Sequence, residues 1–366
     1  MTNRAEAVVN LTAIKSNIAF LKAKSGVDLM AVVKADAYGH GLVPVAQAAL
    51  DGGATWLGVA LLEEAIALRG AGITAPILAW LVPPGSDFKS AADCDIDIAI
   101  ASIKTLAEVS KVKSSKRPRI HLEVDTGMSR GGFLGEWDQI DLQHMQDVEL
   151  VGIFSHFARA DEPGQPQNLA QLNRFKKMAA NLESFGYDHL IYHLSNSAAT
   201  IVDQESAFDM VRTGIAMYGL TPDLKSMGTS QSLGLKPAMT LRAKLHLAKD
   251  VPAGSPVGYG ATEMTKSDTK LGLVAMGYAD GIPRIAKGAG VFHDGKRAPI
   301  IGRVSMDQFV VDLGATSTAQ SGDWVTVFGP GDNGEYTADD WASASGSINY
   351  EIVTRIGPRV PRIYEL

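Results

Sequence analysis

Short apolar runs alternate with helical patterns along the first 235 residues of the chain. Many of the runs are continuous in valine, isoleucine and leucine, which is typical of parallel strands buried on both faces. The pattern predicts eight strands, at residues 28–33, 56–60, 76–80, 95–101, 119–124, 150–155, 190–194 and 209–212.

Helical periodicity fills the segments between these strands. Leu11, Ile14 and Ile18 recur three or four residues apart behind Asn10, a good helix N-cap. The longest helical stretch covers residues 168–185 and is closed by Gly186. Eight strand–helix units predict a (β/α)8 TIM-type barrel, with a doubly wound open sheet as the alternative.

The last part of the chain has a different period. Residues 241–247 alternate between apolar and polar side chains, and short apolar runs follow at 271–275, 300–304, 309–313 and 324–328. Turn signals separate these runs, as in an all-β domain. We therefore predict a barrel domain at 10–235 and a β domain at 236–366 with one short helix at 337–344. Residues 1–9 are expected to add a strand to the β domain.

Composition narrows the class of protein. Hydrophobic residues make up 46% and charged residues 20% of the chain, which excludes a disordered protein. The net charge of −6 includes no basic cluster, so nucleic acid and anionic membranes are not the expected partners. Cys94 is the one cysteine, so no intramolecular disulfide is possible. No segment resembles a secretion signal or a membrane span, and we expect a cytoplasmic protein.

Polar residues follow several of the predicted strands directly. Because chemistry in a barrel collects at the C-terminal ends of the strands, these residues are expected to converge on one rim. They are Lys34, the segment from Asp125 to Arg130, His156, Asn196 with Ser197, and Arg212.

Lys34 stands alone after four apolar residues. Partial burial would lower its pKa and free the amine to form a Schiff base, for which pyridoxal phosphate is the natural partner. Ser197 and Gly214 would then cradle the phosphate. Arg212 beside the ring nitrogen would disfavour protonation there. The plainer alternatives are a solvent-facing lysine, ordinary helix caps and an arginine in a surface ion pair.

The chain resembles the alanine racemase family. The resemblance rests on ten motifs in order, at residues 31–41, 124–130, 155–158, 195–199, 211–220, 257–262, 277–281, 304–308, 348–351 and 359–362. It implies a barrel that holds pyridoxal phosphate, a C-terminal β domain, and a homodimer with shared active sites.

The resemblance also implies residue roles. Lys34 joins the cofactor and acts as one catalytic base, and Tyr259 acts as the other. Arg130 bonds the phenolic oxygen of the cofactor and steers the substrate carboxylate. Arg212 faces the pyridine nitrogen, and His156 lies between Arg212 and Tyr259. The other implied residues are Tyr38, Asn196, Ser197, Gly214, Ile215 and Tyr350 at the cofactor, Met306 and Asp307 from the neighbouring subunit, and Tyr278 with Tyr350 at the access corridor.

The need for two bases also follows from the chemistry of inversion at Cα, without the resemblance. A proton leaves one face of the carbon and another arrives at the opposite face. Lys34 serves one face only, so a second acid–base group is needed. Tyr259, with an ordinary pKa near 10, needs nearby positive character to act at neutral pH. Without the resemblance, Tyr259 would be interpreted as a half-buried strand tyrosine.

Glu123 departs from the family pattern, which often has a carbamylated lysine that holds the arginine at the position of Arg130. Residues 121, 123 and 125 share one face of a strand, so Glu123 can point inward with Asp125. We expect Glu123 to orient Arg130 by a charge-assisted contact, direct or bridged. The alternative is a glutamate that turns to another partner.

Several functions compete at this point. The preferred function is interconversion of L-alanine and D-alanine, which supplies D-alanine for peptidoglycan. Related alternatives are a racemase of serine or of broader specificity and an amino-acid decarboxylase on the same scaffold. A metal-dependent barrel hydrolase, using residues such as His40, His121 and His193, lacks the usual ligand spacings and leaves Lys34 unexplained. A non-catalytic pyridoxal-phosphate carrier has no use for the β domain.

Overall fold

The computed structural model describes residues 3–137, 140, 145–184, 186–187 and 189–366. The chain forms two compact units. The barrel unit consists of Ile14–Ala37 and Leu42–Leu235, and the β unit consists of the described part of Met1–Ala13 together with Tyr38–Gly41 and Lys236–Leu366.

The barrel unit contains eight parallel strands in the order β8-β7-β6-β5-β4-β3-β2-β9. They are β2 (Asp28–Val32), β3 (Trp56–Val59), β4 (Ile77–Ala79), β5 (Ile96–Ile100), β6 (Arg119–Glu123), β7 (Glu149–Phe154), β8 (Ile191–His193) and β9 (Met210–Thr213). The amides of Asp209 and Arg212 donate to the carbonyls of Tyr192 and Ser195, which nearly closes the sheet between β8 and β9. The predicted barrel is therefore confirmed, and the open sheet is wrong.

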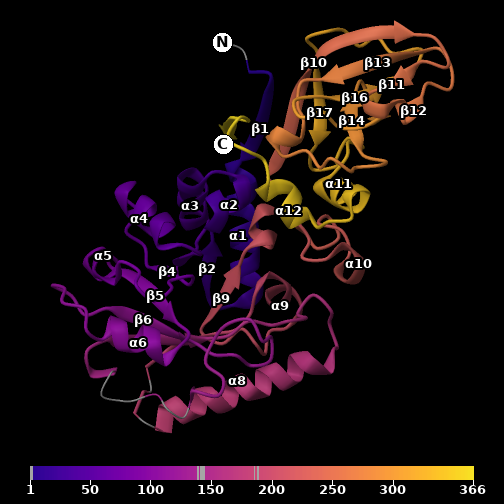
Figure 1. The fold of residues 1–366 in the computed structure, drawn as a ribbon. Helices are drawn as coiled ribbons and strands as arrows, with labels where there is room; N and C mark the ends of the chain where they lie inside the picture. The colour runs from indigo at the N-terminus through magenta and orange to yellow at the C-terminus, as the bar shows by residue number, and fades with distance from the viewer. Residues whose placement is uncertain (1–2, 138–139, 141–144, 185, 188) are drawn as a thin grey trace. The chain divides into compact units, whose positions relative to one another are not determined.

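Helices cover the outside of these strands, as Figure 1 shows for α4, α5, α6 and α8. The helices are α1 (Leu11–Ser25), α3 (Leu42–Asp51), α4 (Leu62–Gly70), α5 (Phe88–Asp93), α6 (Ile103–Val109), α8 (Pro166–Ser184), α9 (Ser197–Val202), the 3-10 turn η2 (Ile215–Tyr218) and α10 (Leu224–Met227). The Asn10 side chain caps α1 by accepting from the Ala13 amide at 2.8 Å. Residue 185, the predicted end of the longest helix, lies outside the described residues. Among the described residues, no helix has the length and hydropathy to cross a bilayer.

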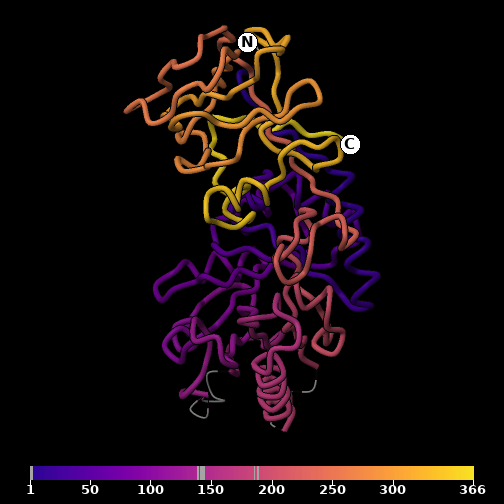
Figure 2. The backbone as a smooth tube through the Cα atoms, turned by 90° about the vertical axis from the view of Figure 1, so that its right-hand side faces the viewer, coloured from indigo at the N-terminus to yellow at the C-terminus, as the bar shows by residue number. Residues whose placement is uncertain are grey.

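The β unit is built on a sheet whose main path runs β15-β14-β17-β10-β1-β18, with β13 pairing β10 and β16. Its strands are β1 (Ala5–Asn10), β10 (Met239–Val251), β13 (Thr269–Val274), β14 (Gly290–His293), β15 (Lys296–Pro299), β16 (Phe309–Asp312), β17 (Trp324–Phe328) and β18 (Arg362–Glu365), with a hairpin of β11 (Pro256–Val257) and β12 (Glu263–Met264). Helices α11 (Ala338–Ser345) and α12 (Asn349–Thr354) and the 3-10 turns η3 (Tyr259–Ala261) and η4 (Tyr278–Asp280) complete the unit. β1 pairs antiparallel with β10 and parallel with β18, and Figure 2 shows this indigo segment among orange and yellow ones.

The predicted strand at 300–304 is wrong. Ile300 forms only an isolated bridge with Val311, and no ladder continues along the segment. Gly302 has a φ of +77°, and a side chain there would meet the Val257 carbonyl oxygen at 2.8 Å. The apolar pattern was therefore misleading because a left-handed glycine turns the backbone in the middle of the run.

Candidate active site

Lys34 follows β2 after one intervening residue, Val33, and is partly buried in the barrel unit. Burial lowers the pKa of its amine, the charge of Arg130 lowers it further, and Glu64 opposes the change. The Lys34 Nζ lies 5.7 Å from the centroid of the Trp80 ring. This is the environment of a lysine that gives up its proton more easily than one in solvent.

The backbone after Lys34 is strained. Ala35, Asp36, Ala37 and Tyr38, all in α2 (Lys34–Gly39), have φ between +52° and +53°, which makes a left-handed turn. Each such residue costs about 1–2 kcal/mol. Side chains hold the turn: Glu64 Oε1 accepts from the Ala35 amide at 2.6 Å and Asp36 Oδ1 accepts from the Leu42 amide at 2.8 Å. Strain held in this way is characteristic of functional sites.

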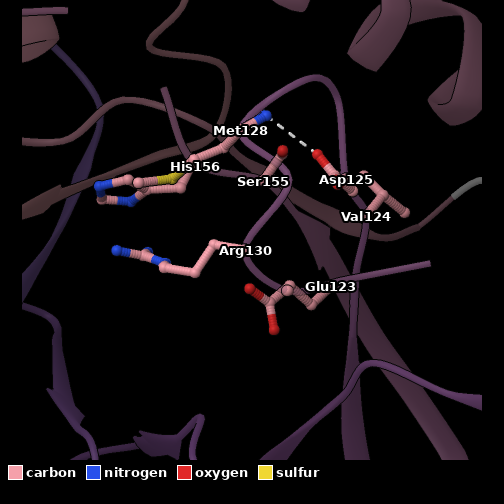
Figure 3. A pocket seen from close by; sticks show the side chains of 8 residues that line it. Glu123, Val124, Asp125, Met128, Arg130, Ser155 and His156 are labelled. Atoms are coloured by element: carbon pink, nitrogen blue, oxygen red, sulfur yellow. Dashed lines mark hydrogen bonds between the residues drawn. The ribbon is translucent and has the colours of Figure 1, made fainter. Parts of the chain in front are cut away.

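Arg130 lies on a loop that Asp125 organises. One carboxylate oxygen of Asp125 accepts from the amides of Gly127, Met128 and Ser129 at 2.8, 3.0 and 3.1 Å. The loop borders a small pocket that Arg130 and His156 also line. In Figure 3 the guanidinium of Arg130 points to the same side of this pocket as the His156 ring.

Glu123 ends β6 and lines the same pocket. Burial raises the pKa of its carboxyl, while the charges of Arg130 and Arg212 act in the opposite direction. Its carboxylate lies beside Gly131, where an added Cβ would be 3.1 Å from Oε1. Within the described part of the chain, Glu123 and Arg130 form no direct hydrogen bond or ion pair, so any contact between them needs a bridge.

Arg212 is buried at the end of β9, so the interpretation as a surface ion pair is wrong. Its guanidinium donates to the carbonyls of His193 and Ser155, both at 2.6 Å, and approaches His156 Nδ1 at 3.3 Å. Burial lowers the pKa of Arg212 to about 10, which leaves it a cation at neutral pH.

Burial also affects His156, which is neutral at pH 7. Burial, together with the charges of Arg212, Arg130 and Lys34, lowers its pKa to about 3. Because arginine can only donate, the Nδ1 atom that faces Arg212 must be the acceptor, and the ring proton must be on Nε2.

Two backbone amides converge on Ser197, the first residue of α9. The amides of Gly214 and Ala216 donate to Ser197 Oγ at 2.9 and 3.3 Å. Asn196 caps the same helix by accepting from the Ala199 amide at 3.1 Å. A hydroxyl and several backbone amides in one place are the kinds of group that bind phosphate oxygens.

Charges of both signs meet at this site. The cations are Lys34, Arg130 and Arg212; Glu64 acts on Lys34, and Glu123 acts on both arginines. The cations can bind anionic groups such as a phosphate or a carboxylate.

Ile215 is buried at the start of η2 in the barrel unit, and the remaining predicted site residues lie in the β unit. The rings of Tyr38 and Tyr350 are 6.2 Å apart between centroids. Tyr259 lies on η3 and is 72% exposed, so the interpretation as a half-buried strand tyrosine is wrong. The carbonyl of Met306 accepts from the Ala279 amide at 2.9 Å, next to Tyr278.

Asp307 follows Met306 and is tied to the same region. Its carboxylate accepts from Arg359 at 2.7 Å, and Arg359 also contacts Asp280 at 3.1 Å. Tyr278, Met306 and Asp307 are thus neighbours in the β unit, although sequence reasoning gave them separate roles.

Comparison with known proteins identifies the family. The profile of the family "Alanine racemase, N-terminal domain" matches residues 9–222, and that of "Alanine racemase, C-terminal domain" matches residues 238–364. The alanine racemase of Salinispora arenicola is 49% identical over 372 residues, which cover 99% of this chain and 98% of that protein. The chain belongs to the alanine racemase family. The predicted resemblance is therefore confirmed.

Other alanine racemases agree in sequence and fold. That of Thermobifida fusca is 48% identical, with 100% of this chain and 99% of its own length covered. The crystal structure of alanine racemase from the D-cycloserine producer Streptomyces lavendulae has a TM-score of 0.95 and 46% identity, covering 100% of this chain and 98% of that one. Barrel and β unit thus correspond to alanine racemase structure over their full length.

Proposed function

We propose that this chain is a pyridoxal-phosphate-dependent racemase that interconverts L-alanine and D-alanine. The observation that carries the proposal is the lysine at the mouth of the barrel. Lys34 has a lowered pKa, lies near the cation Arg130 and begins a strained turn. Membership of the alanine racemase family supports the same function.

The residues present fit pyridoxal phosphate. Lys34 offers an amine for the aldehyde, the amides around Ser197 suit a phosphate, and the cations Arg130 and Arg212 suit the other acceptor atoms of the cofactor. The residues that we propose to hold it are Lys34, Tyr38, Arg130, Asn196, Ser197, Arg212, Gly214, Ile215 and Tyr350. When bound, pyridoxal phosphate acidifies the Cα–H bond of an amino acid joined to it.

The chain's own residues then move protons on opposite faces of Cα. Lys34 takes or returns the proton on one face, and Tyr259 of a second subunit does so on the other. Neutral His156 has its ring proton on Nε2, since Nδ1 accepts from Arg212. That N–H is available to stabilise the deprotonated oxygen of Tyr259.

We also propose a homodimer with shared active sites. Tyr259 is 72% exposed and Met306 is 54% exposed, which leaves both available to a neighbouring subunit. Met306 would bind the substrate carboxylate through its amide beside Asp307, and Arg130 would bind it from the barrel. Tyr278 and Tyr350 would narrow the access corridor, which favours a substrate as small as alanine.

The proposed product has a clear use. D-alanine made in the cytoplasm would supply peptidoglycan. A borohydride treatment of the purified protein should bleach a visible absorption band and block Lys34. Racemisation should then be measured with L-alanine, L-serine and a panel of larger amino acids. D-alanine is the expected main product, whereas carbon dioxide and an amine would identify a decarboxylase.

We propose that Glu123 positions Arg130 through a bridging water or anion, because the two side chains line one pocket and, among the described residues, no direct hydrogen bond or ion pair joins them. A charge-assisted contact of this kind contributes about 1.5–3 kcal/mol, so Glu123→Ala should lower kcat/KM roughly 10- to 100-fold. The wild type should be indifferent to removal of bicarbonate, whereas Glu123→Lys should require it. Rates in carbon-dioxide-free buffer with and without added bicarbonate test both points.

Glu123→Gln is the matched control, because it keeps the length of the side chain and removes the charge. It should behave like Glu123→Ala. Full activity of Glu123→Ala would contradict the proposal, since nothing at this position would then need to be negative.

A further inference from the structure

A chain of polar side chains crosses the interior of the barrel below Arg212. His193 Nδ1 lies 3.3 Å from Arg212 Nη1, and His193 Nε2 lies 2.9 Å from His121 Nδ1. His121 Nε2 in turn lies 3.2 Å from Asp97 Oδ2. The four residues come from β9, β8, β6 and β5.

The chain is dry. Asp97, His121 and His193 are at most 1% exposed, and the surroundings are apolar. The Phe154 ring stacks on His193 at 5.0 Å between centroids, and the Trp56 ring meets His121 edge-on at 5.5 Å. Polar groups in such a place are retained at a cost in stability unless each is satisfied.

Gly152 makes room for the contact between the two histidines. It is paired with His121 across β6 and β7. A Cβ at Gly152 would lie 2.6 Å from His121 Nδ1 and 2.6 Å from the Ile191 carbonyl oxygen. The histidine pair therefore exists only because this strand residue has no side chain.

The two ends give the chain a direction. Arg212 can only donate, so His193 Nδ1 must accept and the proton of a neutral His193 is on Nε2. That proton is donated to His121 Nδ1, which leaves the proton of a neutral His121 on Nε2. Ionised Asp97 can only accept a hydrogen bond, and it accepts the one that His121 Nε2–H donates.

Asp97 is held in its ionised form. Burial raises the pKa of its carboxyl, but hydrogen bonds from His121 and Arg119 outweigh burial and lower it overall. Arg119 donates a hydrogen bond to each carboxylate oxygen of Asp97, from Nε to Oδ1 at 2.8 Å and from Nη2 to Oδ2 at 3.2 Å. Arg119 also contacts the exposed Glu149 at 2.8 Å. The hydrogen-bond chain thus ends on the ion pair of Asp97 and Arg119, near the N-terminal ends of β5 and β6.

Arg212 needs such support. Within the described residues, no carboxylate lies at ion-pair distance from its buried guanidinium, which rests on carbonyl groups and on His156 and His193. An unpaired charge in an apolar interior is costly. We propose that Asp97, His121 and His193 are positioning residues, which orient Arg212 and compensate its charge through one directional hydrogen-bond chain.

The consequence for catalysis rests on the proposed function, in which Arg212 faces the cofactor. The hydrogen-bond chain from Arg212 to Asp97 does not depend on the proposed function. A second proton on His121 would convert Nδ1 into a donor and force His193 Nε2 to accept. The proton of neutral His193 would then be on Nδ1, directed at another donor, and its bond to Arg212 would be lost.

Nuclear magnetic resonance of the full-length purified protein tests the chain directly. With ¹⁵N-labelled histidine, the ring nitrogen shifts report the protonation of His121 and His193, which single His→Asn variants assign. At pH 7 both rings should be neutral and protonated on Nε2. A proton on Nδ1 of His193, or a doubly protonated ring at either position, would overturn the proposal, whether or not the protein racemises alanine.

Two variants at His121 test its effect on Arg212. The amide oxygen of His121→Asn replaces Nδ1 as the acceptor for His193, whereas His121→Phe offers no acceptor. Because displaced supporting groups commonly cost 10- to 100-fold, we expect about that loss of kcat in His121→Phe, with little change in KM. His121→Asn should recover most of the loss and keep the His193 proton on Nε2.

Met30→Leu, an apolar exchange in the same barrel core, is the matched control and should keep its activity. Equal kcat in His121→Phe and His121→Asn would refute the positioning role. Should either variant fail to fold, the resonance measurement on the unaltered protein still decides the direction of the chain. An absence of racemase activity in the unaltered protein, by contrast, would refute the proposed function alone.

Discussion

Tyr259→Phe is expected to abolish racemisation while the exchange of one Cα proton with solvent continues. Lys34 remains able to remove and return a proton on its own face, but no group delivers one to the opposite face. General acid–base groups contribute at least about 100-fold, so racemisation should fall by that factor or more. Deuterium incorporation into L-alanine and D-alanine in heavy water, followed separately for each, measures the effect.

One enantiomer should continue to incorporate deuterium and the other should not. Equal loss of exchange from both would contradict two distinct bases. Tyr336→Phe is the matched control in the same unit, because it removes one hydroxyl and keeps the ring that lies 4.4 Å from Arg297. It should leave racemisation unchanged.

The barrel was predictable because its signal is repeated. Each of the eight apolar runs lies within one or two residues of an observed strand, and polar residues at the ends of several runs mark the C-terminal ends of those strands. Since the C-terminal ends of parallel strands lie at one edge, the sequence alone places Lys34, His156 and Arg212 at the same rim.

The strained turn after Lys34 was not predictable. Ala35, Asp36 and Ala37 have no local preference for a left-handed backbone, which is imposed by Glu64 and by contacts at a distance in sequence. Only Gly39 and Gly41 hint at an unusual path. Tertiary contacts here override the local preference of the chain.

The polar chain below Arg212 was also hidden, for a different reason. His121 and His193 are 72 residues apart, and only the register of β6, β7 and β8 brings them together. In the sequence they resembled metal-ligand candidates. The structure instead gives each ring a hydrogen-bonding partner on both nitrogens.

Mixing two inactive variants is expected to restore activity if the sites are shared. Lys34→Ala removes one base and Tyr259→Phe removes the other, so each homodimer is inactive. In a mixed dimer, one site combines the intact lysine of one subunit with the intact tyrosine of its partner. With equal amounts and free exchange, half of the dimers are mixed and half of their sites work, which gives about a quarter of wild-type activity.

A second mixture gives the opposite control. The double variant, with both substitutions, is exchanged with the wild type at equal amounts. If each site takes Lys34 from one subunit and Tyr259 from the other, mixed dimers have no complete site, and about a quarter of the activity remains. If each subunit completes its own site, about half remains. A shared site would be excluded if half of the activity remains in this mixture and none is recovered in the first mixture despite proven subunit exchange. Both experiments test the same pairing, that of Lys34 from one subunit with Tyr259 from the other.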